Sequence, residues 1–214
     1  MQYHHGDLKN ALIQAGLELL KNEGPKGFSL RKAAKKAGVS HSAPYSHFRN
    51  KDDLIAAIAI EGFKRLIAHL TEEPRFTAPR EKKDFFDLAW QYMKFALDNP
   101  DYYTVMFSQA IHPSEHEGLG GTSIEALRIL LNAVGAAQKG GILKKENPFL
   151  TALTIWSSLH GICSLLISNY IPEENHIAAA PLTPMGKTEH VLDREKAHGL
   201  CEFCMNQIYL GIKA

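Results

Sequence analysis

The chain alternates between stretches in which apolar residues recur every three or four positions and short breaks rich in Gly, Pro and Asn. This spacing is typical of amphipathic helices. It predicts helices over about 7–20, 29–37, 40–48, 51–70, 80–97, 101–110, 122–139, 148–170 and 188–211. No stretch has the alternation of a strand, and no internal repeat is visible. The pattern therefore predicts an all-α protein of about nine helices.

Capping residues set the expected ends of several of these helices. Asn50 can cap the long helix over 51–70, and Thr122 with Glu125 has the spacing of a capping box. Gly140 and Gly141 are expected to end that later helix. Residues 24–27, 71–79 and 171–187 are expected to be connections, because Gly or Pro interrupts each of them.

The segment Phe28–Lys51 predicts two short helices joined by a tight turn. Ser29 can cap the first helix, Gly38 can end it with a positive φ, and Val39 is expected to fill the corner. Ser40 is expected to cap a second helix that runs to Phe48. Two short helices joined by a few residues with a Gly form the helix-turn-helix pattern.

In that motif the start of the second helix meets base edges in the major groove of DNA. His41 and Ser42 can exchange hydrogen bonds with bases, Ala43 is small enough for close approach, and Tyr45 and His47 can reach phosphates. The alternative is a helical hairpin whose basic face is merely solvated. We predict DNA contacts from Ser29, Ser40, His41, Ser42, Ala43, Tyr45, His47 and Lys51.

The segment SLRKAAKKAGVSHSAPYSHFRNKDDL resembles the TetR-like transcriptional regulators, through Gly-Val-Ser, Tyr45-x-His47-Phe48 and Lys51. Trp156-Ser-Ser-Leu-His160-Gly161 is similar to the Trp-x-x-x-His-Gly sequence of one subgroup. Two positions depart from the family pattern. Ala33 stands where a larger aliphatic residue is usual, which indicates a looser core. Lys32 stands where an acid is frequent, which indicates a stronger grip on phosphate.

The resemblance implies an N-terminal helix-turn-helix DNA-binding domain, expected over 1–51, and a helical effector-binding and dimerisation domain, expected over 52–214. It further implies a homodimer through the last two helices and a palindromic double-stranded DNA operator. The helix over 148–170 is apolar on nearly all sides, so burial against a partner suits it. Two recognition helices about 34–36 Å apart would read the two half-sites.

Composition and charge fit this interpretation. Hydrophobic residues make up 45% and charged residues 22% of the 214 positions, as in ordinary globular proteins. The net charge of +1 conceals a basic N-terminal part, because residues 1–51 hold nine Lys or Arg against three acids. No cleavable signal and no membrane span are expected, so the sequence predicts a cytoplasmic protein without a membrane partner.

An unknown small-molecule effector is expected between the helices of the second domain. Aromatic walls with a few polar groups suit such a site, although aromatic residues at helical spacing are more often simply core. A lone His on an apolar helix, such as His160, is also more often a satisfied core group. The candidates are Trp90, Met93, Tyr103, Phe107, Trp156 and His160.

Three cysteines, Cys163, Cys201 and Cys204, leave an odd count and are expected to be reduced. His198, Cys201 and Cys204 lie at i, i+3 and i+6, which could form part of a metal or redox sensor, but buried thiols fit better. No phosphate loop, Gly-x-Ser-x-Gly or His-Glu-x-x-His motif is present. We therefore expect no catalytic site, no metal and no cofactor.

The sequence thus predicts a sequence-specific DNA-binding transcriptional regulator, a repressor released from its operator by a small molecule. The alternative is a helical ligand-binding or protein-interaction protein whose N-terminal domain does not read DNA sequence. The exposed surface expected around His41, Tyr45 and Lys51 favours the regulator.

Overall fold

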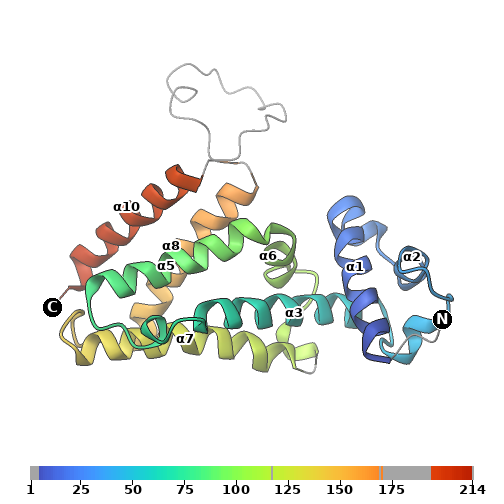
Figure 1. The fold of residues 1–214 in the computed structure, drawn as a ribbon, viewed down its shortest axis with the longest axis horizontal. Coiled ribbons are helices and arrows are strands. Elements are labelled where there is room, and N and C mark those ends of the chain that lie inside the picture. Colours follow the sequence, from blue (N-terminus) through green and yellow to red (C-terminus); the bar gives the residue numbers. More distant parts are fainter. Residues whose placement is uncertain (1–4, 117, 169, 171–193, 214) are drawn as a thin grey trace, which may run out of the picture. The chain divides into compact units, whose positions relative to one another are not determined.

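The computed structural model describes residues 5–116, 118–168, 170 and 194–213, and over these residues it contains helices, turns and one isolated β-bridge (Figure 1). The described α-helices are α1 (His5–Gly27), α2 (Leu30–Lys36), α3 (Lys51–Thr71), α4 (Pro74–Thr77), α5 (Lys82–Asp98), α6 (Pro100–Met106), α7 (Leu119–Lys139), α8 (Pro148–Ile167) and α10 (Arg194–Ile212). Two 3-10 helices are η1 (Ala43–Ser46) and η2 (Pro113–Glu115). The predicted all-α class is confirmed. The predicted connection 171–187 and the predicted start of the last helix at Thr188 lie outside the described residues.

The chain divides into two compact units. The first unit comprises Met1–Ala68 and Asn99–Arg128, and the second comprises His69–Asp98 and Ile129–Ala214. Helices α3 and α7 contribute residues to both units. The domain boundary expected between residues 51 and 52 stays a prediction.

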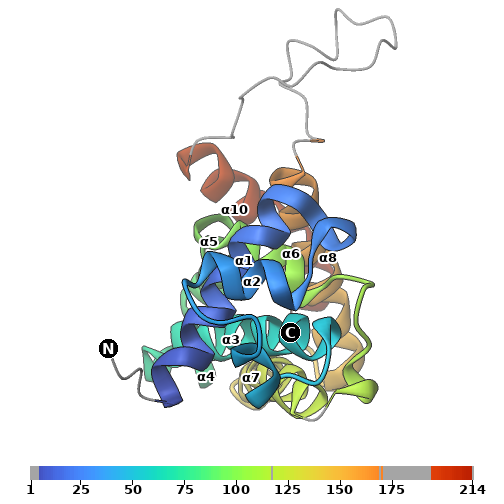
Figure 2. The same cartoon turned by 90° about the vertical axis from the view of Figure 1, so that its right-hand side faces the viewer.

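The core of the first unit lies between α1, α2, η1 and the first half of α3. Each of these elements contributes apolar side chains with at most 5% exposure: Leu12, Leu30, Ala33, Ala34, Pro44, Leu54 and Ile58. A Cβ on Gly16 of α1 would lie 2.9 Å from Cδ1 of Ile58, so α1 and α3 approach closely at this glycine. Figure 2 shows α1 and α2 next to each other, as their packing requires.

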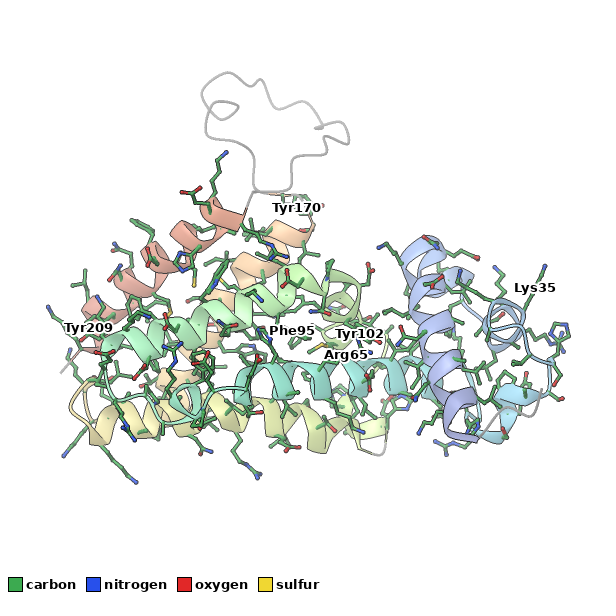
Figure 3. The ribbon with its side chains drawn as sticks, in the orientation of Figure 1. Lys35, Arg65, Phe95, Tyr102, Tyr170 and Tyr209 are labelled. Carbon is green, nitrogen blue, oxygen red and sulfur yellow. The ribbon has the colours of Figure 1, made fainter. Side chains whose placement is uncertain are left out.

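Helix α6 also belongs to the first unit and packs on α1 and α3. The Tyr102 hydroxyl accepts a hydrogen bond from Nε2 of Gln14, 2.8 Å away. The guanidinium of Arg65 lies 4.6 Å from the centre of the Tyr102 ring, and Figure 3 shows the two side chains together. Lys21 and Asp101 add an ion pair at 2.9 Å. Residues following Asn99 are therefore part of the unit that carries the helix-turn-helix.

The second unit is built on α5, α8 and α10, which pack on one another. Its fully buried side chains include Met93, Ala96, Ile155, Cys163 and Met205, each 0 to 1% exposed. Aromatic contacts join α5 to α10: Trp90 meets His198 with ring centres 4.6 Å apart, and Phe86 meets Tyr209 at 5.8 Å. The ammonium of Lys82 lies 4.6 Å from the centre of the Phe86 ring. Burial of these rings stabilises the pairing of the two helices.

Some predicted helix ends are right and others are wrong. Asn147 caps α8 by accepting from the backbone N–H of Phe149 and Leu150, and Gly141 ends α7 with a φ of 74°. The capping box at Thr122 is wrong, because α7 begins at Leu119, so Thr122 lies within the first turn of the helix, and its hydroxyl donates to the carbonyl of Gly118, the residue before the helix. The expected turn at residues 24–27 is a kink instead. Gly24 leaves helical geometry at φ 67° and ψ 179°, and the chain then resumes a helical turn to Gly27.

Candidate nucleic-acid interface

Helix α2 begins and ends at the residues that the sequence indicated. The Ser29 hydroxyl accepts a hydrogen bond from the backbone N–H of Lys32 at 3.2 Å. At the other end Gly38 has a φ of 71°, its N–H donates to the Lys35 carbonyl, and the Val39 N–H donates to the Ala34 carbonyl. This pair of bonds is the Schellman motif, which turns the chain sharply after a helix. The turn is therefore fixed by backbone bonds.

The second helix of the motif is shorter than predicted. The expected helix over 40–48 is wrong: the described structure has only the 3-10 helix Ala43–Ser46. An α-helical bond to the Ser40 carbonyl would need an N–H at position 44, which Pro44 lacks. The backbone N–H of Ala43 donates to that carbonyl instead, at 3.0 Å, in the i to i−3 pattern of a 3-10 helix. Pro44 is buried, and Phe48, whose N–H bonds to the Pro44 carbonyl, is 3% exposed. These two residues anchor the segment on the core.

Four of the eight predicted DNA-contacting residues are exposed on this segment. Ser40, His41 and Ser42 are exposed, and the two serine hydroxyls are 3.2 Å apart. Tyr45 is 56% exposed. An exposed tyrosine beside polar side chains that can donate and accept hydrogen bonds suits recognition of a phosphate and base edges.

Four other predicted residues take different places. Lys51 is exposed at the first position of α3. Ala43 and His47 are half-buried, and the His47 ring lies 6.2 Å from that of Phe48. Ser29 is half-buried and its hydroxyl is engaged as the cap of α2. The structure thus brings the predicted set into one segment of the first unit, with Ser29 at the start of the neighbouring helix.

The sequence prediction missed Arg49, whose side chain is 83% exposed. Its Nε donates to Asp53 at 2.8 Å and its Nη2 donates to the same carboxylate at 3.1 Å. The hydrogen bond from Arg49 is the main cause that lowers the pKa of Asp53 below its ordinary value. The i, i+4 spacing of the two residues at a helix start could have identified the pair.

The basic residues of α2 divide into two sets. Lys32 and Lys36 form ion pairs with Glu23 and Glu18 of α1, each at 2.5 Å. The predicted contact of Lys32 with DNA phosphate therefore competes with the ion pair between Lys32 and Glu23. Arg31 and Lys35 are exposed, and Figure 3 shows Lys35 directed away from the helix. These two residues add positive charge beside the segment 40–51.

The effector candidates fall into two groups, one in each unit. In the second unit Nε1 of Trp156 donates to the Tyr92 hydroxyl at 3.2 Å, and Nδ1 of His160 is 3.3 Å from the same oxygen. Burial lowers the pKa of His160. Met93 is fully buried, and Trp90 packs against His198. Tyr92 was not among the predicted residues, although it joins two of them.

The other two candidates, Tyr103 and Phe107, belong to the first unit. Their ring centres are 4.9 Å apart, and Phe107 meets Phe63 of α3 at 5.6 Å. Tyr103 is 3% exposed. These contacts are those of a packed aromatic cluster.

The cysteines have the environment of core residues. Cys163 and Cys201 are buried and Cys204 is half-buried, all as free thiols. Burial raises the pKa of Cys201 to about 12, and the nearby Cys163 and Cys204 add to the effect. A thiol with a raised pKa is a poor nucleophile and a poor metal ligand at neutral pH. Among the described residues no group of three or more His, Cys, Asp or Glu is arranged to hold a metal ion.

Two family models match this chain. Residues 12–58 match the bacterial regulatory proteins of the tetR family, and residues 85–180 match the tetracyclin repressor-like C-terminal domain. The chain is similar to the HTH-type transcriptional regulator YobS of Bacillus subtilis, with 23% identity over 80% of this chain and 85% of that protein. It is also similar to the class A tetracycline repressor of Escherichia coli, with 38% identity over 36% of this chain and 32% of that protein.

Solved structures agree with these matches. A protein of unknown function from Rhodococcus sp. RHA1 superposes with a TM-score of 0.77 at 25% identity, covering all of both chains. A tetR-family regulatory protein from Rhodococcus RHA1 shares the fold with a TM-score of 0.68 at 17% identity, over 94% of this chain and 96% of that one. The chain belongs to the TetR family of transcriptional regulators. It is therefore a DNA-binding transcriptional regulator, and regulators of this family bind DNA operators and act as dimers.

Proposed function

We propose that the protein is a homodimeric repressor that reads its operator through residues 40–51 and leaves the operator when a small molecule binds the second unit. The observation that carries the proposal is the exposed polar surface of Ser40, His41, Ser42 and Tyr45 on a segment that the buried Pro44 and Phe48 anchor on the core. An anchored segment presents its side chains to bases without a large ordering cost.

We assign different roles to the residues of this surface. His41 and Ser42 would read base edges and Ala43 would allow close approach, while Tyr45, His47 and Lys51 would hold phosphates. Ser29 would act at the start of α2 and stabilise that helix as its cap. The exposed Arg31 and Lys35 would add to the attraction for phosphate without selecting a sequence.

The dimer interface that we propose is the apolar surface of α8 and α10. Large apolar side chains between 39% and 62% exposed lie on these two helices: Phe149, Leu150, Leu153, Leu165, Phe203 and Leu210. An apolar surface of this kind is unusual on a monomer and marks a contact surface. A second copy of the chain would cover it and would place two helix-turn-helix segments on a palindromic operator.

Helix α8 is also long and apolar enough, by length and composition alone, to cross a membrane: its most apolar 18-residue stretch has a mean hydropathy of 1.6, and 28% of that stretch is buried. The match of residues 85–180 to a repressor-like domain favours a partner helix over lipid as its environment. We accordingly propose a cytoplasmic protein without a membrane partner. We also propose that it acts by binding and catalyses no reaction.

For the effector we propose a contact surface of the second unit formed by Trp90, Met93, Trp156 and His160. The support is the group of polar atoms that Trp156, Tyr92 and His160 bring together. A few polar groups in an apolar setting are typical of small-molecule sites. Tyr103 and Phe107 of the first unit stay predictions as effector contacts.

The test compares two lysines of one helix. Lys51→Ala removes the exposed lysine at the start of α3, and Lys64→Ala removes an exposed lysine further along the same helix. Lys51→Ala should weaken binding to DNA from upstream of the protein's own gene and lower the slope of log affinity against log salt by about 1. A reporter driven by that DNA should rise with Lys51→Ala and stay repressed with Lys64→Ala. Equal behaviour of the two variants would contradict the proposed interface.

A further inference from the structure

The carboxylate of Asp53, in the first turn of α3, holds the backbone that follows η1. The Asp53 carboxylate accepts a hydrogen bond from the Arg49 backbone N–H at 3.1 Å. The Asp53 backbone N–H donates to Oδ1 of Asn50 at 2.9 Å. The Arg49 guanidinium completes the contact with two further bonds. Three residues thus fix each other at the junction between η1 and α3, much as a capping box does.

A residue from a distant part of the chain reaches the same carboxylate. Nδ1 of His116 lies 3.5 Å from Oδ1 of Asp53, and the two side chains are only 11% and 15% exposed. His116 follows the 3-10 helix Pro113–Glu115, and its carbonyl accepts the backbone N–H of Leu119 at the start of α7. A half-buried contact of this kind is screened less by salt than a surface ion pair.

The surroundings make His116 suitable as a fixed point. Residues 99–128 belong to the first unit, and Tyr102 and Asp101 tie α6 to α1 through Gln14 and Lys21. The segment between α6 and α7 is therefore held at both ends, by α6 on one side and by the His116–Asp53 contact on the other. Because its side chain is 11% exposed, His116 itself is not placed to contact DNA.

We infer that Asp53 is a positioning residue for DNA recognition, and that His116 holds it, so that the α6–α7 segment sets the geometry of the segment that reads DNA. The inference rests on the proposed function of residues 40–51. If the α6–α7 segment shifts, His116 leaves Asp53, the junction at Arg49 and Asn50 loosens, and the side chains at 40–51 lose their common orientation. Specific binding then falls more than non-specific binding, because base readout needs the orientation and phosphate attraction does not.

The test measures the affinity of the full-length protein for DNA from upstream of its own gene and for scrambled DNA, in three variants. His116→Ala removes the contact, His116→Arg restores a nitrogen donor near Asp53, and His112→Ala is the control. His112 is an exposed histidine of the same segment whose ring contacts only local residues in the described structure, at Ser114. If His116→Ala does not fold, as judged by thermal unfolding, His116→Gln takes its place.

We expect His116→Ala to lower affinity for the specific DNA by about three- to thirtyfold, which lies within the range of coupling between contacting residues. Affinity for scrambled DNA should change less than twofold, His112→Ala should match the wild type, and His116→Arg should recover most of the loss. An equal loss on both DNAs, a loss of the same size in His112→Ala, or no recovery in His116→Arg overturns the inference. A wild-type protein that does not distinguish the two DNAs contradicts the proposed function instead.

Discussion

The indole Nε1 of Trp156 donates a hydrogen bond to the hydroxyl of Tyr92, 3.2 Å away, and so joins α8 to α5 in the second unit. The same hydroxyl lies 3.3 Å from Nδ1 of His160. When Tyr92 accepts from Trp156 it can donate to His160, which requires a neutral imidazole with its proton on Nε2. The lowered pKa of His160 agrees with that neutral form. The Trp-x-x-x-His sequence therefore places two partners of one tyrosine a single helical turn apart.

Tyr92→Phe should lower the free energy of unfolding by about 1–3 kcal/mol, because it takes a hydrogen-bond partner from both Trp156 and His160 in a half-buried setting. Tyr102→Phe is the matched control. Tyr102 is also buried, but its hydroxyl accepts from the exposed Gln14, which can turn to water, so we expect a loss of about 0.5 kcal/mol. Urea denaturation measures both. Equal losses would show that the Tyr92 network adds nothing to stability.

His160→Gln should make the stability of the protein less sensitive to acid. The folded-state pKa of His160 lies below its unfolded value, so its contribution is complete above the unfolded pKa and is lost as the pH falls toward the folded one. Between pH 7 and pH 5 the wild type should therefore lose more unfolding free energy than His160→Gln does. Thermal unfolding across this range in both proteins checks the sign. A steeper loss in the variant would contradict the burial of a neutral His160.

Gly38→Ala should destabilise the first unit by about 1–2 kcal/mol, because Gly38 has a φ of 71° that a side chain with a Cβ adopts at a cost. Gly121→Ala is the control in the same unit. Gly121 is an exposed helical glycine with nothing near the position of an added Cβ, so alanine should stabilise by about 0.4–1 kcal/mol. Denaturation midpoints of the two variants should move in opposite directions. Movement in the same direction would contradict the assigned turn geometry.

Leu165→Glu should convert the protein to monomers and abolish specific DNA binding, because it places a charge on the proposed dimer surface of α8. Ile124→Glu is the control, because it shows whether a glutamate at an exposed apolar position outside the proposed interface also produces monomers. Ile124 is 57% exposed on α7 in the first unit, and Leu165 is 47% exposed. Sedimentation velocity should show monomers for Leu165→Glu and dimers for Ile124→Glu. Dimers in both variants would place the interface elsewhere.

Local chemistry explains what the sequence predicted correctly. Ser29, Gly38 and Asn147 each act on backbone groups within a few residues, so their residue types alone indicate a helix start or a helix end. The short second helix of the motif was mispredicted because the pattern 41–48 suits an α-helix, whereas buried Pro44 and the Ala43 bond to Ser40 make a 3-10 turn.

Contacts between distant residues could not be predicted from one sequence. Nothing near Asp53 indicates His116, and nothing near Trp156 indicates Tyr92, since these pairs meet only through the packing of whole helices. Lys32 shows the same limit. A lysine at a position where the family often has an acid suggested a phosphate contact, and only the fold reveals that Glu23 of α1 is within reach.

The most direct test of the account is the preference of the wild-type protein for DNA from upstream of its own gene over scrambled DNA, measured at low and at moderate salt. Binding through phosphates alone falls steeply with salt and is equal for both DNAs, whereas base readout keeps its preference as salt rises. We predict a preference of at least about a thousandfold that survives at moderate salt. Equal binding to both DNAs, lost together as salt rises, and no site recovered by selection from random DNA would contradict sequence reading by residues 40–51.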